Sequence, residues 1–305
     1  MHRRAWLLMA LLAALWGASY LFIKVALDDL SPAALVFART ALGALVLAPV
    51  AARRGAFAPA RRHLGTLALI AAVQIAGPFL LIAAGEQSIP SSLAGILVAS
   101  APIWTAILAG AFVPEERLPR LGLAGVALGI VGVALLFGVD LGGGDALLGG
   151  ALILLASLGY AIGALVAKRR LADVPAVGLV ASIMSLGTLF LLPALPFAAP
   201  GHAPGLDTVA ALLALGLGGT GVAFLIFYVL NAEVGPSRAS IVAYIAPGFS
   251  VAYGVTLLDE PFTAGTAAGL ALILAGSWLA ADGRAPRLSR SGPSRSSAPA
   301  PARAR

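Results

Sequence analysis

The chain has 305 residues, of which 60% are hydrophobic and only 11% are charged, and its mean hydropathy is +0.98. A soluble domain of this length needs a far more polar surface, so the composition excludes an ordinary soluble enzyme or binding module. The net charge of +7 would indicate an anionic partner for a soluble protein, but in so apolar a chain it must be interpreted loop by loop.

Ten apolar segments follow one another, each about 20 residues long, which suffices to cross a bilayer at ~1.5 Å per residue. We predict transmembrane helices near residues 5–26, 32–51, 64–84, 91–112, 120–138, 146–167, 175–197, 207–231, 238–257 and 263–281. The first segment follows Arg3 and Arg4, as a signal peptide would. However, it is too long for the apolar core of a signal peptide, and no small-residue cleavage site precedes Asp28. We therefore expect an all-α integral membrane protein with ten transmembrane helices.

The basic residues indicate how the chain is threaded through the membrane. Eighteen of the 20 lysines and arginines fall at the amino terminus, in every second loop or in the tail. The other two, Lys24 and Arg39, lie within predicted spans. Because cytoplasmic loops are enriched in basic residues, we expect a multi-pass protein of the cell membrane with both termini in the cytoplasm. The charge then gives no reason to expect a nucleic-acid partner.

The two halves of the chain repeat one another. A shift of 145 positions places Pro102 on Pro247, and the same shift places Glu115 on Glu260. Repetition on this scale indicates one structural unit that has been duplicated. Because each unit holds five spans, an odd number, the second unit must enter the membrane in the opposite orientation, as in the inverted repeats of transporters.

The repeat also predicts how the chain is divided. We place a first five-helix repeat at residues 1–140 and a second, inverted repeat at 141–283, joined by the glycine-rich linker 139–145. Residues 284–305 contain no acidic residue and no large apolar cluster, so we expect a disordered, basic, cytoplasmic tail.

Glycines at i, i+4 spacing allow helix backbones to approach closely in membranes. The fifth span carries such a pair at Gly125 and Gly129, and the tenth carries one at Gly265 and Gly269. We therefore predict that the fifth and tenth spans pack on each other.

The order of motifs along residues 5–281 resembles the EamA family of the drug/metabolite transporter superfamily. The matching features are Trp16-Gly17-Ala18-Ser19-Tyr20, Arg39, Ala101-Pro102, Glu116, Ala246-Pro247 and Asp259-Glu260. The resemblance implies ten helices, cytoplasmic termini and export of amino acids or other small metabolites.

Several polar and aromatic side chains fall near the predicted middle of the membrane. We predict a substrate cavity between the halves that is lined by Trp16, Tyr20, Gln74, Thr105, Tyr160 and Tyr244. Gln74 is the best single candidate, because an amide at the bilayer centre needs a partner. For the others the alternative remains that hydroxyl groups bond to their own helices and that the aromatic rings only pack.

Three prolines and two basic residues lie within predicted spans. Pro78, Pro102 and Pro247 remove helix hydrogen bonds, so they are candidate kinks or hinges. Arg39, about 10 Å below the outer end of its span, could bind a substrate carboxylate. It could equally pair with Asp28 or Asp29, or bind backbone carbonyls as a structural element. Lys24 could likewise bind a substrate carboxylate or have a structural role, and near the outer interface its side chain could extend toward water.

The sequence offers no catalytic constellation. It contains no Walker A motif and no cysteine, and His2, His63 and His202 fall in the terminus or in loops. We therefore predict no catalytic residue, no cofactor and no metal site. No acidic residue is expected to be buried in the spans, and Glu86 lies near the outer end of the third span. The energy source thus stays open between proton coupling at Glu86 and passive transport.

The function that these features predict is secondary transport across the inner membrane, with export of small metabolites such as amino acids by alternating access between the repeats. The expected partners are a small-molecule substrate and the lipid bilayer. The sequence is compatible with a monomer and leaves the oligomeric state open. The alternatives are a membrane-embedded scaffold or enzyme without transport activity, and a channel, which would need a continuous polar lining.

Overall fold

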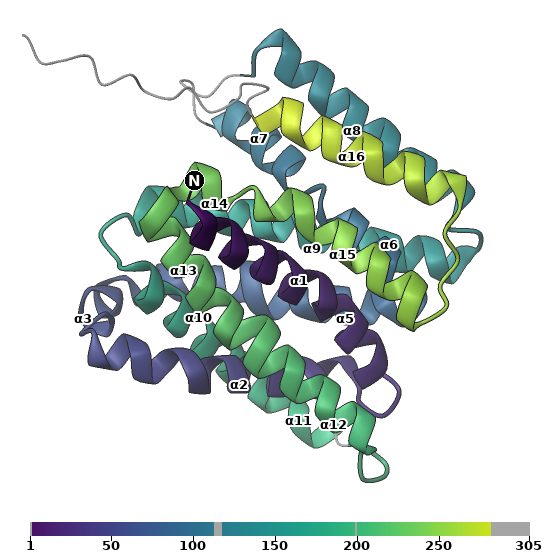
Figure 1. Cartoon of the computed structure of the whole chain (residues 1–305). Helices are drawn as coiled ribbons and strands as arrows, with labels where there is room; N and C mark the ends of the chain where they lie inside the picture. Colours follow the sequence, from purple (N-terminus) through teal and green to yellow (C-terminus); the bar gives the residue numbers. More distant parts are fainter. Residues whose placement is uncertain (1, 113–117, 199, 282–305) are drawn as a thin grey trace, which may run out of the picture.

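The protein is described here by a computed structural model that covers residues 2–112, 118–198 and 200–281. Within these ranges every regular element is helical (Figure 1). The predicted tail at 284–305, and Glu115 and Glu116, lie outside the described residues.

The first half contains five spans, three of them unbroken. These are α1 (Arg3–Ala26), α2 (Pro32–Arg53) and α8 (Arg120–Val139). The third span is built from α3 (Phe57–Ala60), η1 (Arg61–His63), α4 (Leu64–Ile70), η2 (Ala71–Ala76) and α5 (Gly77–Glu86), and the fourth from α6 (Ser91–Val98) and α7 (Ala101–Phe112).

The second half follows the same plan. Its first and last spans are α9 (Gly144–Arg170) and α16 (Ala264–Ala281). Between them lie three composite spans: α10 (Ala176–Leu191), η4 (Leu192–Ala194) and α11 (Leu195–Ala198); α12 (Leu206–Leu213), η5 (Ala214–Val222) and α13 (Ala223–Val234); and α14 (Pro236–Ala239) with α15 (Val242–Leu257).

The ten predicted helices are confirmed. Nine stretches of the described chain are long and apolar enough to cross a membrane, and α15 is a shorter apolar helix of the same kind. Their outer surfaces are apolar as well: Leu45 on α2 is 67% exposed and Leu148 on α9 is 60% exposed. A helix that is hydrophobic on all sides is stable only inside a protein core or in lipid, so these faces indicate a bilayer around the bundle.

The helix contacts are reciprocal between the two halves. The first span, α1, packs on α15 of the ninth, while the sixth span, α9, packs on α6 and α7 of the fourth. The second span packs on the seventh, through α2 and α10, and the fifth packs on the tenth, through α8 and α16. Exchanging the two halves leaves this scheme unchanged, as expected for two inverted five-helix repeats.

Helix irregularities also recur in both halves. The segment η2 is π-helical, and a shift of 145 positions places it within η5, which is π-helical too. Pro78 lies in the first turn of α5, directly after η2, and Pro102 lies in the first turn of α7, directly after the break in the fourth span. Pro247 differs, because α15 is helical on both sides of it. The ninth span is instead interrupted at Ser240 and Ile241.

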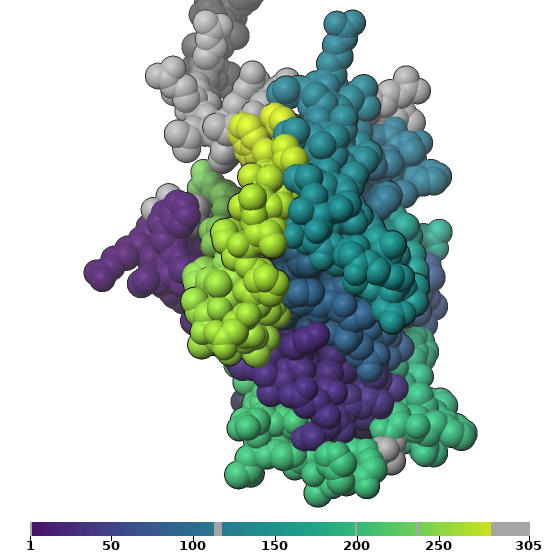
Figure 2. Space-filling model, turned by 90° about the vertical axis from the view of Figure 1, so that its right-hand side faces the viewer, coloured from purple at the N-terminus to yellow at the C-terminus, as the bar shows by residue number. Residues whose placement is uncertain are grey.

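The predicted contact between the fifth and tenth spans is confirmed. In Figures 1 and 2, α8 and α16 lie side by side along their length. A Cβ added at Gly125 would lie 2.5 Å from the Ala280 nitrogen and 2.8 Å from the Gly276 oxygen. A Cβ added at Gly276 would lie 2.5 Å from the Gly129 nitrogen. Since these neighbours are backbone atoms, the two helices touch at a distance that only glycine allows.

This contact predicts the effect of a single methyl group. Gly276→Ala should force α8 and α16 apart and destabilise the protein by about 1–3 kcal/mol, the usual cost of overpacking. The matched control is Gly138→Ala, because Gly138 also lies in α8 but has nothing within 4 Å of an added Cβ. The control should be neutral or slightly stabilising, since alanine favours helix over glycine by up to about 1 kcal/mol. Thermal denaturation of the detergent-purified protein measures both, and equal melting temperatures would contradict the close contact.

Candidate substrate site

Arg39 is a buried cation that both halves of the protein hold in place. It extends from α2, is 7% exposed, and its Nε donates a hydrogen bond of 3.0 Å to Thr220 Oγ1. Its guanidinium carbon lies 3.8 Å from the centre of the Phe79 ring on α5, a distance at which cation and ring attract each other. The first repeat thus supplies the ring, and the second supplies the hydroxyl.

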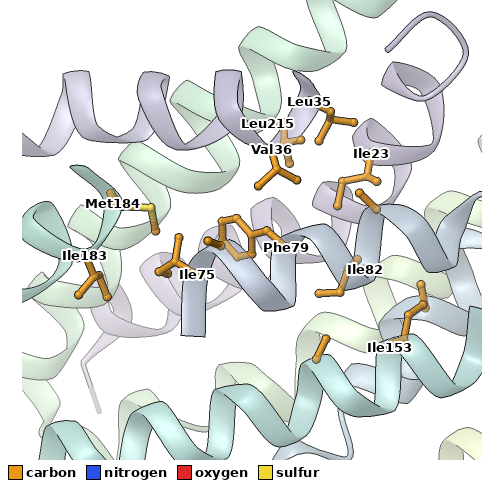
Figure 3. Close-up of a cluster of buried hydrophobic side chains, with 14 of the residues drawn as sticks. Ile23, Leu35, Val36, Ile75, Phe79, Ile82, Ile153, Ile183, Met184 and Leu215 are labelled. Atoms are coloured by element: carbon orange, nitrogen blue, oxygen red, sulfur yellow. The ribbon is translucent and has the colours of Figure 1, made fainter. Parts of the chain in front are cut away.

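The π-helical turn of η5 positions the partner of Arg39. The Thr220 hydroxyl donates to the Leu215 carbonyl, five residues earlier, at 3.0 Å, which fixes the rotamer of the threonine. Around this pair lies the apolar core between α2, η2, α5, α10 and η5. Figure 3 shows Phe79 pointing into this core together with Val36, Ile75 and Met184. In this apolar setting the arginine cannot exchange its contacts for bulk water.

Two of the predicted site residues gather around Arg39. The tyrosines Tyr20 on α1 and Tyr160 on α9 both interact electrostatically with its guanidinium group. Tyr20 also lies against α6, because a Cβ added at Gly95 would be 3.2 Å from its ring. We refer to Arg39, Phe79, Thr220, Tyr20 and Tyr160 as the Arg39 cluster. The cluster joins three spans of the first half, through α1, α2 and α5, to two spans of the second half, through α9 and η5.

Gln74 lies in η2 and faces α9. A Cβ added at Gly163 would lie 2.6 Å from both Cβ and Oε1 of Gln74, so this glycine makes room for the amide. Within the described ranges, no residue forms a hydrogen bond with the Gln74 side chain. The amide is half-buried, and it keeps both its donors and its acceptor available.

The other three predicted cavity residues have different partners. Trp16 packs against Phe224 and Phe227 of α13, with ring centres 5.9 Å and 5.3 Å away. Thr105 donates to the carbonyl of Ala101 in its own helix, the alternative considered for hydroxyl groups. Tyr244 points its hydroxyl at the Ser277 carbonyl on α16, at 3.5 Å. The structure therefore separates these three from the Arg39 cluster.

Lys24 binds main-chain carbonyls. Its Nζ donates to the Glu86 oxygen at 2.5 Å and to the Ile89 oxygen at 3.1 Å. A cation at this place satisfies carbonyls at the C-terminal end of α5 and complements the helix dipole. Of the two alternatives for Lys24, these contacts support the structural one.

A carboxylate from the second half closes the start of the fourth span, at the end of the bundle that the basic residues predict to face outward. Glu260 accepts hydrogen bonds from the backbone nitrogens of Ser91, at 2.6 Å, and Ser92, at 2.9 Å. These are unsatisfied donors at the N-terminus of α6, where a negative charge is favourable. Ser250 of α15 adds a bond of 3.1 Å to the Ser91 carbonyl. We call the Glu260 contact with Ser91 and Ser92 the outer gate.

The two parts of the fourth span have partly different neighbours. Before the break, α6 packs on α15, α9 and α1, and after it, α7 packs on α9, α16 and α8, so α9 lies beside both parts. At the break, the carbonyl of Ala99 accepts a hydrogen bond of 2.9 Å from the Ser277 hydroxyl. The hydroxyl groups of Ser100 and Ser157 lie 3.1 Å apart beside it. Side chains from the second half thus replace the helix bonds that the break removes.

Glu86 contradicts one expectation from the sequence. No acidic residue was expected to be buried in the spans, yet Glu86 is 0% exposed and neither carboxylate oxygen has a hydrogen-bond partner among the described residues. Counting along the third span places Glu86 at the water boundary. In the folded protein, Lys24 binds over the end of α5, and the side chain of Glu86 is buried although Gln87 and Ser88, directly after it, are exposed.

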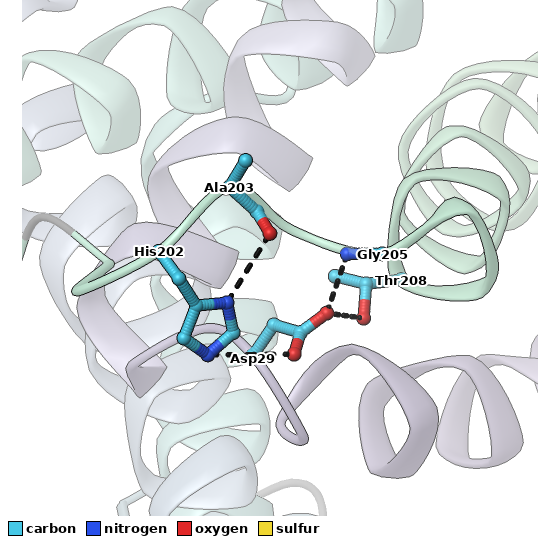
Figure 4. A network of polar contacts seen from close by, with 5 residues as sticks. All are labelled: Asp29, His202, Ala203, Gly205 and Thr208. Atoms are coloured by element: carbon cyan, nitrogen blue, oxygen red, sulfur yellow. Dashed lines mark hydrogen bonds and ion pairs between the residues drawn. The ribbon is translucent and has the colours of Figure 1, made fainter.

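The loops that follow α1 and α11 supply a further link between the halves (Figure 4). The Asp29 carboxylate accepts hydrogen bonds from Thr208 Oγ1 at 2.6 Å and from the Gly205 nitrogen at 2.7 Å, and His202 lies 3.9 Å away. Both hydrogen bonds lower the pKa of Asp29 below its ordinary value of 3.8, and the bond from Thr208 has the larger effect. The contribution of this contact to stability is therefore present above that value and is lost only as the pH falls through the lowered pKa.

The position of Asp29 also decides one alternative for Arg39. Because the Asp29 carboxylate is bonded to Gly205 and Thr208, it does not pair with Arg39. Thr220, which the sequence did not single out, is the hydrogen-bond partner instead. The only local signal for Thr220 was its place in a glycine-rich stretch of the eighth span.

Two surface hollows lie away from the predicted cavity residues. One, of about 460 Å³, is lined at the outer end by Leu80, Leu81 and Phe197 among others. The other, of about 240 Å³, lies near Phe112 and Arg169. Neither is lined by any of the six residues predicted to form the substrate cavity.

Known proteins of similar sequence are named as transporters. An uncharacterized transporter of Archaeoglobus fulgidus is 26% identical over 279 residues, which are 90% of this chain and 98% of that protein. A Salmonella typhimurium protein named "Probable amino-acid metabolite efflux pump" is 29% identical, over 92% of this chain and 95% of its own. A Streptantibioticus cattleyicolor protein named "Probable terminal-alkyne amino-acid exporter" is 28% identical, over 80% of this chain and 82% of its own.

The fold and the repeats are shared as well. A crystal structure that is 22% identical in sequence superposes with a TM-score of 0.66 and covers 92% of this chain and 97% of its own, which shows a common fold. The sequence profile of the EamA-like transporter family matches the chain twice, at residues 4–138 and 147–281, once in each half. The chain therefore belongs to the EamA-like transporter family.

Proposed function

We propose that this protein is a secondary transporter of the cell membrane that exports small metabolites bearing a carboxylate, with amino acids as the main class. Membership of the EamA-like transporter family supports transport. Two relatives named for amino-acid or amino-acid metabolite export, at 28% and 29% identity, support the substrate class.

The observation that carries the proposal is the set of hydrogen-bond donors that Arg39 leaves unused. In the described part of the chain, Thr220 is the only hydrogen-bond partner of its side chain, and it uses Nε. The two terminal nitrogens are thus left to bind a carboxylate in the paired geometry that guanidinium groups prefer. Phe79 and Thr220 hold the guanidinium group before substrate arrives, which lowers the entropy cost of binding.

The residues around Arg39 suit an amino acid. Tyr20 and Tyr160 offer ring faces and hydroxyls, and Gln74, which faces the helix that carries Tyr160, offers an amide. A few directed polar groups within apolar walls are the usual composition of a small-molecule site. Trp16, Thr105 and Tyr244 stay predicted lining residues for states in which the halves are arranged differently.

Alternating access requires gates that the two halves form together. The outer gate is such a contact, since Glu260 of the second repeat holds the start of α6 in the first. Breaking it releases the start of α6 from Glu260, and the break at Ala99 and Ser100 then allows α6 to move against α15 while α7 keeps its contacts with α8, α9 and α16. Opening this gate exposes the Arg39 cluster to the outer side of the membrane, and closing it shields the cluster again.

The first functional prediction concerns the substrate carboxylate. In proteoliposomes, counterflow with a panel of the standard L-amino acids identifies the best substrate. Arg39→Lys keeps the charge but loses the paired geometry, so it should lower the apparent affinity for that amino acid about 10- to 100-fold, as expected for losing a hydrogen bond to a charged group. The matched control is Arg120→Lys, at the exposed start of α8, which should transport as the wild type does.

A second comparison tests the same contact from the substrate side. The decarboxylated amine of the best amino acid should compete poorly with it in the wild type and equally poorly in the Arg120→Lys control. Equal competition by the amine, or unchanged affinity in Arg39→Lys, would show that Arg39 does not bind the carboxylate. Absence of counterflow for every amino acid of the panel would refute the substrate class itself.

Gln74 provides a separate prediction. Gln74→Leu removes the amide donors and acceptor while nearly preserving volume, and the side chain can still pack on Gly163. If the amide contacts substrate, efflux should fall at least tenfold while the amount of protein in the membrane and its melting temperature stay unchanged. Normal transport, or loss of the protein from the membrane, would identify Gln74 as a packing residue.

The orientation proposed for the chain, with both termini in the cytoplasm, can be tested by labelling because the native sequence has no cysteine. Ala58→Cys places a thiol at an exposed position in the loop region proposed to face the cytoplasm. Gly142→Cys places one in the linker proposed to face outward, where nothing lies within 4 Å. In intact cells, an impermeant thiol reagent should label Gly142→Cys only. Labelling of Ala58→Cys alone would reverse the topology.

A further inference from the structure

Glu86 is a buried acid that the proposed substrate contacts do not use. It ends α5, and both of its carboxylate oxygens are buried without a hydrogen-bond partner. The hydroxyl groups of Ser91 and Ser92, at the start of α6, share this property. Of the five buried side-chain atoms without a partner in the described part of the chain, four therefore belong to this one turn between α5 and α6.

An anionic carboxylate in this position is costly. A charge removed from water without a partner carries a large free-energy penalty, and binding a proton removes the charge. Lys24 does not offset the penalty by pairing, because its Nζ is bonded to the main-chain oxygens of Glu86 and Ile89. Burial without a partner therefore favours the protonated form of Glu86 in the conformation of this structure.

Charged and titratable groups reach Glu86 from several of the elements around it. These groups are Tyr20 and Lys24 on α1, Arg39 on α2, Tyr160 on α9, which interacts with Tyr20 and Arg39, and Glu260 after α15. The nearest part of α6 contributes only the hydroxyl groups of Ser91 and Ser92. The surrounding charges are of both signs, so the affinity of Glu86 for a proton depends on which of them is close in each state of the protein.

Among these groups, Glu260 of the outer gate carries the same charge as an ionised Glu86. Glu260 holds Ser91 and Ser92 through its carboxylate, only five and six residues after Glu86. An anionic Glu86 repels this carboxylate, and a protonated Glu86 does not. Protonation of Glu86 thus favours the closed outer gate, whereas loss of the proton favours its opening.

We propose that Glu86 is the proton-binding site of a proton–metabolite exchange, which gives the transporter its energy source. The proposal rests on the transport function proposed above and assigns its coupling ion. With the outer gate open, a proton from outside binds an Oε of the Glu86 carboxylate, and the gate closes over the neutral acid. When the protein opens inward, the O–H bond breaks, the proton passes to the cytoplasm and the carboxylate is restored. One proton enters for each substrate molecule exported.

The first test uses the proton itself as the probe and needs no substrate. Infrared spectra of the purified, reconstituted protein are recorded across a pH titration, and the carbonyl band of protonated carboxylic acids is followed. The wild type should show a titrating band that Glu86→Gln lacks and that Glu86→Asp retains at a shifted frequency. The matched control is Glu233→Gln, because Glu233 lies at the opposite end of the bundle in contact with His2 and Arg4. The control should keep the band, and a band that persists unchanged in Glu86→Gln overturns the proposal.

The second test measures coupling. Proteoliposomes are given an imposed pH gradient, and the accumulation of the best amino acid of the panel is divided by its value without the gradient. One pH unit supplies about 1.4 kcal/mol per proton, so the wild type and Glu233→Gln should show a ratio of up to about ten. Glu86→Gln should show a ratio of one. A wild type that ignores the gradient, or a Glu86→Gln protein that responds to it fully, overturns the proposal.

The two tests separate failure of this inference from failure of the transport function. If no amino acid exchanges in the wild type, the proposed function is wrong, and the infrared titration alone decides whether Glu86 binds a proton. If amino acids exchange but the gradient has no effect, the transport function stands and the assignment of Glu86 is wrong. A Glu86→Gln protein that transports nothing is likewise judged by the infrared band and by Glu86→Asp.

Discussion

The hydrocarbon of a bilayer offers no hydrogen bonds to an exposed backbone group, and this constraint governs how the protein treats each interruption of its helices. The freed carbonyl of Ala99 binds the hydroxyl of Ser277, and the free nitrogens of Ser91 and Ser92 bind Glu260. In both cases the second repeat supplies the missing partner. The irregular points of the first repeat are therefore the points at which the two repeats are joined, and relative movement of the repeats must exchange these bonds for others.

The same constraint explains how much the sequence could predict. Hydropathy located all ten spans, since each must cover the bilayer, and the glycine spacing identified α8 and α16 as neighbours because only glycine permits their contact. Pro247 was a candidate kink or hinge of the ninth span; α15 is helical on both sides of it, and the span is interrupted at Ser240 and Ile241. Proline marks a position where a break is tolerated, while the neighbouring helices decide where the chain bends.

Site residues were harder to predict, since their partners lie far apart in the sequence. Counting depth along each span put Tyr20 and Tyr160 among the predicted cavity residues, but it gave no information about which face of its helix each residue occupies. Trp16 and Tyr244 lie at a similar predicted depth yet pack on α13 and α16. Thr220 is 181 residues from Arg39, and no local pattern marks it as a partner. Glu86 is buried where other helices meet the end of α5, among them α1 with Lys24, and a depth count along one helix cannot include such neighbours.

The π-helical segments η2 and η5 have a mechanical consequence for the third and eighth spans. A π turn contains one residue more than the α turn that it replaces, and this surplus can move along a helix one residue at a time. Each step turns the residue that the wide turn passes by about 100° around the helix axis, the angle per residue of an α-helix, while the helix on either side stays in place. Thr220 lies within η5, so such a step at Thr220 turns its hydroxyl away from Arg39. The two spans can thus redirect single side chains inside the membrane, which requires neither a hinge nor any sliding of one helix past another.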